Sequence, residues 1–436
     1  MKKVIITFAF AIIYILSAGN FSAQSVSTSD IDNFWQAFDK IKAEENYEKQ
    51  IEIINRFYID KGTPGLKAIM QARNYTDKSY VDAINKYPEF WKSIRRNTYK
   101  AKSFAAEIEK GTAKLKRIYP DLKPAEVYFT IGVFRTSGTT LDKMVLIGSE
   151  LALADENVDT SEFPESFAGL IPYIKSNPIE KIVFLNVHEY VHTQQKTADG
   201  SELLNQSLRE GVAEFITVKA LKEESSIPAF DYGKQNRLKI KERFAAEMFS
   251  PFYSNWLWNN FDNEFKMRDL GYFVGYDIAK SFYEKSPDKK DAIKEMIELN
   301  YQNPLEVARF VDNTEYFSKS IGKYRKTYEK NRPKVKRILQ FNNRSRNVNS
   351  ALKTITIEFS EKMDKRFRGF ELGPLGKENV LSVKKFLNFS EDGKYINFEV
   401  ELEPDKRYQV LLSESFRNTA GLPLKPFLID IKTKEE

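Results

Sequence analysis

The sequence predicts an α+β protein in which a mostly helical part with a small antiparallel sheet is followed by an all-β sandwich. From about residue 30 to residue 122, apolar residues repeat at the helical spacing of three and four positions. The period changes at Pro124, where strand-like runs begin. After Arg332 the chain consists of short alternating runs that are separated by turn residues, which is typical of a sandwich.

Length and composition indicate a folded protein with about two or three domains. The chain has 436 residues, of which 42% are hydrophobic and 14% aromatic, enough for a sizeable core. The formal charge of +7 is spread along the chain without a nucleic-acid-binding motif, so we expect no nucleic-acid partner. The absence of cysteine excludes disulfides, thiol chemistry, thiolate metal sites and a cysteine-linked lipid anchor.

The first residues are typical of a secretory signal peptide. Lys2 and Lys3 precede the apolar run from Val4 to Leu16, and small residues follow this run. We expect residues 1–23 to be removed and the protein to be exported, to the periplasm or the medium. An uncleaved membrane anchor is the alternative, although the run is shorter than the roughly 20 apolar residues of a membrane span.

Residues 24–123 are expected to form a helical region that packs on the part of the chain that follows. Breaks are expected at Gly62–Gly65 and at Tyr87–Pro88, because glycine and proline interrupt helices. One expected helix places its apolar residues on a single face: Ile31, Phe34, Trp35 and Phe38.

A small sheet is expected next. Residues 127–134 and 144–147 have the composition of strands, and the segment Thr136–Thr140 between them contains turn residues. We therefore expect an antiparallel hairpin. Its edge would offer backbone groups to an extended peptide, and an ordinary hairpin without a ligand is the equal alternative.

The only two histidines of the chain, His188 and His192, enclose Glu189 in a His-Glu-x-x-His motif. Helix positions four apart lie on one face, so both imidazoles can reach one metal ion, with Glu189 beside them as general base. Asn177-Pro178 is typical of a helix start, and the following helix is apolar on nearly all sides, as in a buried helix. Two core histidines that happen to be so spaced are the alternative. The motif predicts a zinc site.

A catalytic zinc ion usually has three protein ligands and one water. Without cysteine or a third histidine, the third ligand must be a carboxylate. Glu210 is the candidate, because we expect it to start the next helix, with Glu214 one turn further on the same face. Glu214 suits the carboxylate that accepts the other N–H of a ligand histidine. The alternative is a capping box from Ser207 to Glu210, in which Glu210 only satisfies a backbone N–H.

The motif His188-Glu189-x-x-His192, followed by Glu210-Gly-Val-Ala-Glu214, resembles the gluzincin metallopeptidases, the group of thermolysin and aminopeptidase N. The resemblance implies a gluzincin-type domain at residues 124–330, zinc bound by the two histidines and Glu210, Glu189 as base, and a peptide or protein substrate. A closer similarity is to uncharacterised bacterial predicted zinc proteases that are related to a gliding-motility lipoprotein. It covers roughly residues 30 to 300 and includes the patterns Gly62-Thr-Pro-Gly65, Gly138-Thr139 and Tyr272-x-x-Gly275-Tyr276.

The same resemblance names further site residues. Aminopeptidase N uses a tyrosine beyond its ligand glutamate to stabilise the negative charge on the carbonyl oxygen, and Tyr272 stands at a similar distance here. Tyr276 is the second choice, and a core role is the alternative for either tyrosine. Gly148-Ser-Glu150 resembles the aminopeptidase strand whose glutamate binds the free amine of the substrate. Gly148, Glu150 and Tyr276 are therefore candidate substrate-binding residues.

The rest of the chain is expected to be helical through Trp256–Trp258 and Gly271–Tyr283, with the last helix ending near Tyr328. Residues 332–436 resemble bacterial Ig-like domains through Ile357-x-Phe-Ser-Glu-x-Met-Asp364 and the later proline- and glycine-containing turns. Such domains space or dock a partner, so the resemblance implies a surface or envelope protein as partner.

Two classes of function follow. The first is an exported zinc metallopeptidase in which Glu189 activates a water, with endopeptidase and aminopeptidase action both open. The second is a non-catalytic, zinc-stabilised surface protein, associated with secretion or motility, that acts by binding. Glu189 distinguishes them, because a structural zinc site does not require a general base.

Overall fold

The computed structural model describes residues 26–259 and 263–435. The predicted signal peptide lies outside these residues. The chain divides into two compact units, Met1–Gln194 with Ile216–Glu223, and Gln195–Phe215 with Glu224–Glu436. The domain boundaries that the sequence predicts after residues 123 and 330 stay predictions. Within the two described ranges, no helix has both the length and the apolarity needed to cross a bilayer.

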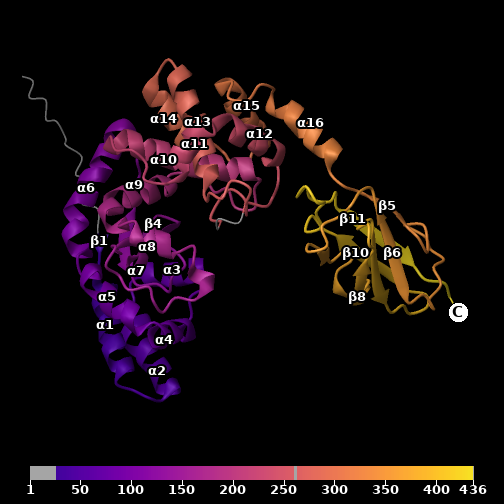
Figure 1. Ribbon diagram of the computed structural model, residues 1–436, viewed down its shortest axis with the longest axis horizontal. Helices are drawn as coiled ribbons and strands as arrows, with labels where there is room; N and C mark the ends of the chain where they lie inside the picture. Colours follow the sequence, from indigo (N-terminus) through magenta and orange to yellow (C-terminus); the bar gives the residue numbers. More distant parts are fainter. Residues whose placement is uncertain (1–25, 260–262, 436) are drawn as a thin grey trace, which may run out of the picture. The chain divides into compact units, whose positions relative to one another are not determined.

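The N-terminal region is helical, as predicted, and Figure 1 shows its helices in indigo and purple. Both predicted breaks fall at helix boundaries, because new helices begin at Pro64 and Pro88. The side chain of Thr63 accepts a hydrogen bond from the backbone N–H of Leu66, which satisfies one free donor of the first turn. The helical elements are α1 (Ser29–Lys42), α2 (Tyr47–Ile54), a π-helical turn (Asn55–Ile59), α3 (Pro64–Arg73), α4 (Asp77–Lys86), α5 (Pro88–Thr98) and α6 (Ala101–Ile118).

Aromatic side chains form the core of these helices. Phe34 and Trp91 are fully buried, and their ring centroids lie 5.0 Å apart. Each buried ring of this size contributes on the order of 1.5–3 kcal/mol relative to an exposed one. Tyr58 and Tyr80 both donate hydrogen bonds to the carbonyl oxygen of Ile131, at 2.6 and 3.1 Å. The helices thereby fix the chain directly after the first long strand of the sheet.

The sheet is mixed, whereas the sequence predicted an antiparallel sheet. Its strands follow the order β1-β2-β4-β3, in which β1, β2 and β4 are parallel and only β3 and β4 are antiparallel. The strands are β1 (Val26–Ser27), β2 (Glu126–Thr130), β3 (Gly138–Leu141) and β4 (Met144–Gly148).

The predicted hairpin is also wrong, because the expected turn around Gly138 is itself strand β3. The chain reverses instead after Leu141, where Asp142 adopts a left-handed conformation with φ of 52°. Thr139 and Thr140 favour a strand, since β-branched residues pack well on a pleated surface. The more apolar segments β2 and β4 become interior parallel neighbours, and the more polar β3 takes the edge.

Helix α9 (Ile182–His192) carries the two histidines and is buried along most of its length, as predicted. It packs on α6 and β3 of the same unit. Its start differs from the prediction, because a 3-10 turn at Pro178–Lys181 precedes it. Asn177 does not cap the helix. It has a left-handed φ of 57°, and its side-chain oxygen accepts from the N–H of Glu156 at 2.7 Å.

Short helices connect the sheet to α9, and longer ones follow it. The segment Trp256–Trp258, which was expected to be helical, forms irregular turns instead. The last helix ends at Asn331, close to the predicted end at Tyr328. The elements are α7 (Ser149–Ala152), a 3-10 turn (Glu165–Phe167), α8 (Ile171–Lys175), α10 (Leu203–Leu221), α11 (Ala229–Gln235), α12 (Arg237–Glu247), α13 (Leu270–Lys285), α14 (Lys289–Glu298), α15 (Pro304–Thr314) and α16 (Ile321–Asn331).

Two glycines allow α10 and α13 to cross with their backbones in contact. A Cβ atom on Gly275 would lie 1.7 Å from the carbonyl oxygen of Ser207. A Cβ atom on Gly211 would lie 2.1 Å from the backbone carbon of Gly275. Real Cβ atoms do not approach backbone this closely, so no larger residue fits either position.

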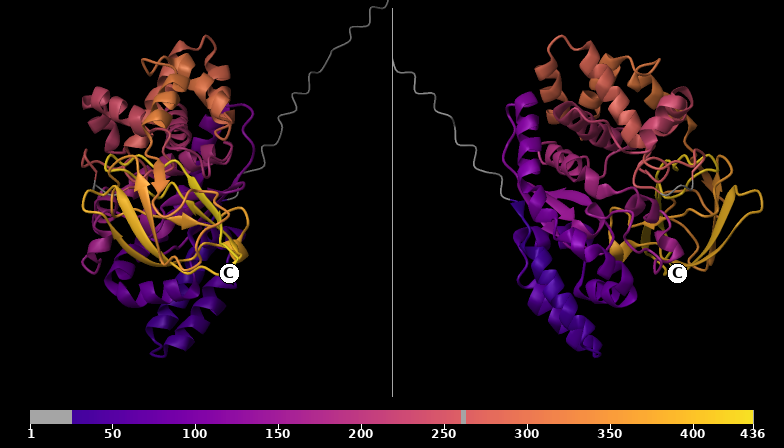
Figure 2. Two further views of the ribbon diagram at one scale, coloured as in Figure 1. Left: turned by 90° about the vertical axis from the view of Figure 1, so that its right-hand side faces the viewer. Right: turned by 60° about the vertical axis from the view of Figure 1, so that its left-hand side comes forward.

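The C-terminal part is all-β, as predicted, and Figure 2 shows its strands from two further sides. Two antiparallel sheets, in the orders β5-β6-β9-β8 and β11-β10-β7, share one apolar core. Alternating residues of β9 enter this core, as the sequence pattern predicts. The strands are β5 (Val335–Ile338), β6 (Thr354–Phe359), β7 (Phe370–Glu371), β8 (Val383–Phe389), β9 (Tyr395–Val400), β10 (Arg407–Leu412) and β11 (Phe427–Lys432), with a 3-10 turn at Lys377–Asn379.

Replacement of Gly275 by alanine tests the helix crossing. In an open helix position, Gly→Ala stabilises by about 0.5–1 kcal/mol. At Gly275 we expect a loss of about 3 kcal/mol, because the backbones must separate. Urea unfolding measures the difference. Gly322→Ala in α16 is the matched control, since its Cβ would meet no atom within 4 Å. Equal effects of the two substitutions would contradict the crossing.

Candidate metal centre

The two histidines of α9 lie on one helical face and point to one place. Their Nε2 atoms are 3.1 Å apart, and their ring planes are nearly perpendicular, at 84°. His188 and His192 are 7% and 6% exposed, so bulk water reaches these nitrogens little. The sequence predicted this arrangement from the spacing of four residues.

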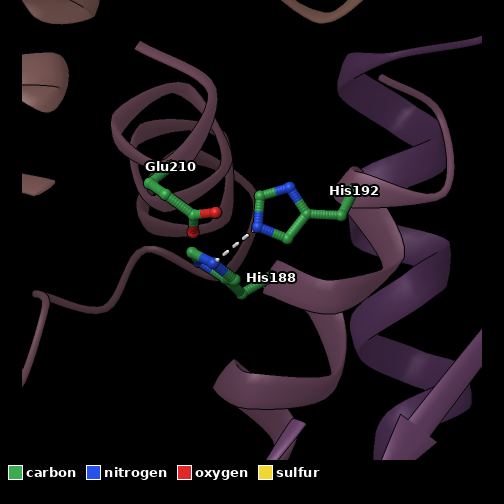
Figure 3. Close-up of side chains that lie close together, drawn as sticks. All are labelled: His188, His192 and Glu210. Atoms are coloured by element: carbon green, nitrogen blue, oxygen red, sulfur yellow. Dashed lines mark hydrogen bonds between the residues drawn. The ribbon is translucent and has the colours of Figure 1, made fainter. Parts of the chain in front are cut away.

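Glu210 of α10 completes a group of three (Figure 3). One carboxylate oxygen and one nitrogen from each histidine all lie within 4.8 Å of one another, and all three residues are buried. The expectation that Glu210 starts the helix was wrong, because α10 begins at Leu203. Ser207 therefore lies inside the helix and cannot be its N-cap, which removes the capping-box alternative.

The donor atoms fit a transition-metal ion. A tetrahedral zinc ion with Zn–N distances of about 2.0–2.1 Å separates two ligand nitrogens by roughly 3.3–3.4 Å, close to the spacing here. Two imidazoles and one carboxylate suit zinc and several other first-row ions. Arg209 also lies near Glu210, with its Nη1 3.4 Å from a carboxylate oxygen. The group is thus able to hold a metal ion, and its geometry alone does not select which one.

Glu189 faces the edge of the sheet. A Cβ atom on Gly138 of β3 would lie 2.8 Å from the Oε1 atom of Glu189 and 3.0 Å from Leu185. Glycine at this position therefore leaves the space that the carboxylate occupies. Sequence reasoning noted Gly138 only as part of a shared pattern and missed its contact with Glu189, because that contact joins two elements far apart in the chain.

Tyr272 lies beside Glu210. Its hydroxyl is hydrogen-bonded to the Glu210 carboxylate, and the indole N–H of Trp258 donates to the phenol oxygen at 3.1 Å. Burial raises the pKa of Tyr272 well above its usual value, and the charges of Glu210 and Asp269 raise it further. The tyrosine therefore stays protonated and able to donate. Its predicted contact with a substrate carbonyl stays a prediction.

Glu214 and Tyr276 each lie one turn beyond a residue of this group. Glu214 is buried one turn after Glu210, as the sequence predicted, and its hydrogen bond to a ligand histidine stays a prediction. Tyr276 is partly buried between the rings of Phe215 and Phe230, at centroid distances of 5.4 and 4.9 Å. These contacts give Tyr276 a packing function, and its predicted contact with substrate stays a prediction.

The candidates Gly148 and Glu150 lie at the end of β4 and the start of α7. Glu150 is fully buried, and its carboxylate accepts hydrogen bonds from the backbone N–H groups of Gly132 and Phe134, at 2.7 and 3.1 Å. A Cβ atom on Gly148 would lie 2.2 Å from the carbonyl oxygen of Thr136. Both residues fix the chain between β2 and β3, and their predicted binding of a substrate amine stays a prediction.

Sequence reasoning missed Trp258 and Arg209 as neighbours of Tyr272 and Glu210. Arg209 stands directly before the predicted ligand, so an ion pair between adjacent residues could have been considered. Trp258 carries no comparable signal. Its contact with Tyr272 joins a segment without regular secondary structure to α13.

Comparisons with known proteins do not identify a family. No protein-family model and no curated protein matches the chain. Two solved structures of a bacterial S-layer protein align with it, both at a TM-score of 0.18. They are rSbsC(31-844), at 13% identity over 94% of this chain and 46% of that one, and the N-terminal part of SbsC, at 15% identity over 93% and 71%. The chain thus spans about half the length of the first structure, and a TM-score this low does not indicate a shared fold.

The titration of Glu150 provides a test of its burial. Burial raises its pKa from 4.5 to about 7, although the backbone hydrogen bonds act in the opposite direction. The folded protein thus keeps a proton that the unfolded chain releases at lower pH. We expect this group to reduce stability as the pH rises from about 4.5 to 7, by on the order of 3 kcal/mol.

Urea unfolding from pH 4.5 to 8 measures this effect. Glu150→Gln, which cannot ionise, should flatten the decline, whereas the exposed control Glu109→Gln should leave it unchanged. An identical pH dependence for wild type and Glu150→Gln would show that Glu150 is not the responsible group.

Proposed function

We propose that this protein is an exported zinc-dependent metallopeptidase of the gluzincin type. The observation that supports this most is the buried group of His188, His192 and Glu210, with Glu189 on the same helix as the histidines. The motif makes zinc the preferred ion, because His-Glu-x-x-His combines two ligands with a general base.

The side chains divide the chemistry among them. Zinc bound by the three residues would polarise a peptide carbonyl and lower the pKa of a water molecule. Glu189 accepts the proton of the attacking water and passes it to the leaving amine. Tyr272 is protonated over the physiological pH range. Its one phenol hydrogen, which points to Glu210 without substrate, would turn to the carbonyl oxygen on which negative charge develops.

The edge strand β3 supports a peptide as substrate. It is the last strand of the sheet, its residues are partly exposed, and Gly138 brings it against Glu189. An extended peptide that pairs with β3 would pass beside the base with its backbone hydrogen bonds satisfied. Backbone pairing is indifferent to side chains, so this geometry favours peptide substrates of varied sequence.

Export and the Ig-like identity of residues 332–436 belong to the same proposal. The apolar N-terminal segment supports export. The two antiparallel sheets with one core support a separate β domain, which would dock a surface or envelope protein.

Cleavage of peptides by the purified protein tests the activity. The zinc-loaded wild type should cleave members of a peptide library, and Glu189→Gln should reduce the rate at least about 100-fold, because the general base is lost. The exposed residue Glu180, in the turn before α9, gives the matched control Glu180→Gln. Zinc content is measured for all three proteins. Equal cleavage by wild type and Glu189→Gln, or a zinc-loaded wild type that cleaves nothing, would contradict the proposal.

The metal ligands are tested separately by chelator competition on folded variants. Glu210→Gln should abolish tight zinc binding, since the anionic ligand is lost. Glu214→Gln should weaken it by about 10–100-fold, as expected for a residue that acts on a ligand histidine. The exposed control Glu223→Gln should bind zinc as the wild type does. Unchanged affinity in Glu210→Gln would assign the third ligand elsewhere.

A further inference from the structure

Trp258 differs from the other three tryptophans of the chain. Trp35, Trp91 and Trp256 are at most 1% exposed, whereas Trp258 is 53% exposed. Its backbone is left-handed, with φ of 51°. This conformation is unfavourable for a bulky residue and persists only where neighbouring contacts enforce it.

Contacts from Asp269 enforce the conformation of Trp258. The backbone N–H of Trp258 donates to Oδ1 of Asp269 at 2.7 Å, and Nε of Arg268 donates to Oδ2 at 2.6 Å. The backbone N–H of Asp269 donates in return to the side chain of Asn259 at 2.8 Å. Trp258 and Asn259 are therefore held to Arg268 and Asp269 by hydrogen bonds, although about half of the Trp258 surface is exposed.

The backbone conformation of Trp258 directs its indole N–H to one acceptor. Nε1 of Trp258 donates to the phenol oxygen of Tyr272 at 3.1 Å. Because this oxygen accepts from the indole, the phenol hydrogen is directed elsewhere, and Glu210 is the partner of the hydroxyl. A chain of two hydrogen bonds thus leads from Trp258 through Tyr272 to the candidate metal ligand. All of these residues belong to one compact unit.

We propose that Trp258 is a positioning residue, which orients the Tyr272 hydroxyl and thereby holds the Glu210 carboxylate in place for the metal ion. The inference rests on the proposed metal centre and deepens it. Hydrogen bonds of this kind to a ligand tune metal affinity by about 10–100-fold. An exposed tryptophan that served only packing would have little effect on either metal binding or stability.

Zinc affinity, measured by chelator competition, tests the chain of hydrogen bonds. Trp258→Phe keeps an aromatic ring and removes the N–H, and we expect it to weaken zinc binding about 10-fold. Tyr272→Phe should weaken it by at least as much. Adding Trp258→Phe to Tyr272→Phe should have no further effect, because the two residues act through the same contact. Additive losses in the double variant would overturn the proposal.

The matched control is Trp256→Phe. The indole of Trp256 also donates to a carboxylate, that of Glu247 at 2.6 Å, but it is fully buried. We expect this variant to lower the urea midpoint and to leave the zinc affinity of the folded protein unchanged. Trp258→Phe should show the opposite pattern.

Fluorescence supplies a readout that is independent of affinity. Since Trp258 is the exposed tryptophan, it should account for the acrylamide-accessible emission, which Trp258→Phe should remove. Zinc should change this emission in the wild type but not in Tyr272→Phe.

The outcomes separate the two proposals. A wild type that binds zinc without cleaving peptides would refute the peptidase and leave the positioning function of Trp258 intact. Unchanged zinc affinity in Trp258→Phe would refute that function alone. A wild type without zinc affinity would refute the metal centre and the function of Trp258 together.

Discussion

The close backbone contact between α10 and α13 is the constraint on which the candidate metal centre depends. Gly211 directly follows Glu210, and Gly275 lies one turn after Tyr272. The helix crossing therefore brings the candidate ligand Glu210 and Tyr272 next to each other. Side chains larger than hydrogen at the two glycines would separate the helices. The hydrogen bond between Tyr272 and Glu210 is therefore a consequence of packing between main chains. The glycines are as much a part of the site as the polar residues they adjoin.

A second requirement is that buried charge be compensated. Within residues 26–259 and 263–435, the hydrogen-bond partners of the Glu150 carboxylate are backbone N–H groups and not cations. Burial raises its pKa to about 7, so that it is neutral over part of the physiological range. Asp277 is compensated by Arg237, which approaches it at 2.6 and 2.8 Å. Glu210 is buried beside two imidazoles, and Nη1 of Arg209 lies 3.4 Å from its carboxylate. A divalent cation held by this group would add positive charge beside the buried carboxylate.

The small sheet and the N-terminal helices determine where the general base lies. Tyr58 and Tyr80 fix Ile131, Glu150 fixes the next residues, and β3 then follows at the sheet edge. Gly138 at the start of β3 leaves room for the carboxylate of Glu189. The helical region thus has a function beyond covering the sheet, because it sets the position of the strand that borders the base.

The sequence by itself determined the elements whose signals are local. The spacing of His188 and His192 placed both imidazoles on one face, and alternation in residues 354–359 and 396–400 identified the strands of the C-terminal part. The start of helix α5 at Pro88 was predicted because proline interrupts a preceding helix. The sequence also identified Glu210 as a candidate metal ligand, but only because other ligand residues are absent and through a family resemblance. The helix start that the sequence predicted at that residue was wrong.

Only the tertiary structure decided the remaining features, because they depend on contacts between distant segments. Thr136–Thr140 looked like a turn, yet β4 offered a partner and made residues 138–141 an edge strand. Strand β3 lies between β2 and β4 in the sequence, and the parallel pairing of β2 with β4 depends on it. No local sequence pattern encodes this pairing. Trp258 acquires its contact with Tyr272 from a left-handed backbone that Asp269 holds, a conformation that the residue type disfavours. Local composition determines which residues can form a helix or act as a metal ligand. The packing of segments far apart in the sequence determines which of these residues come into contact.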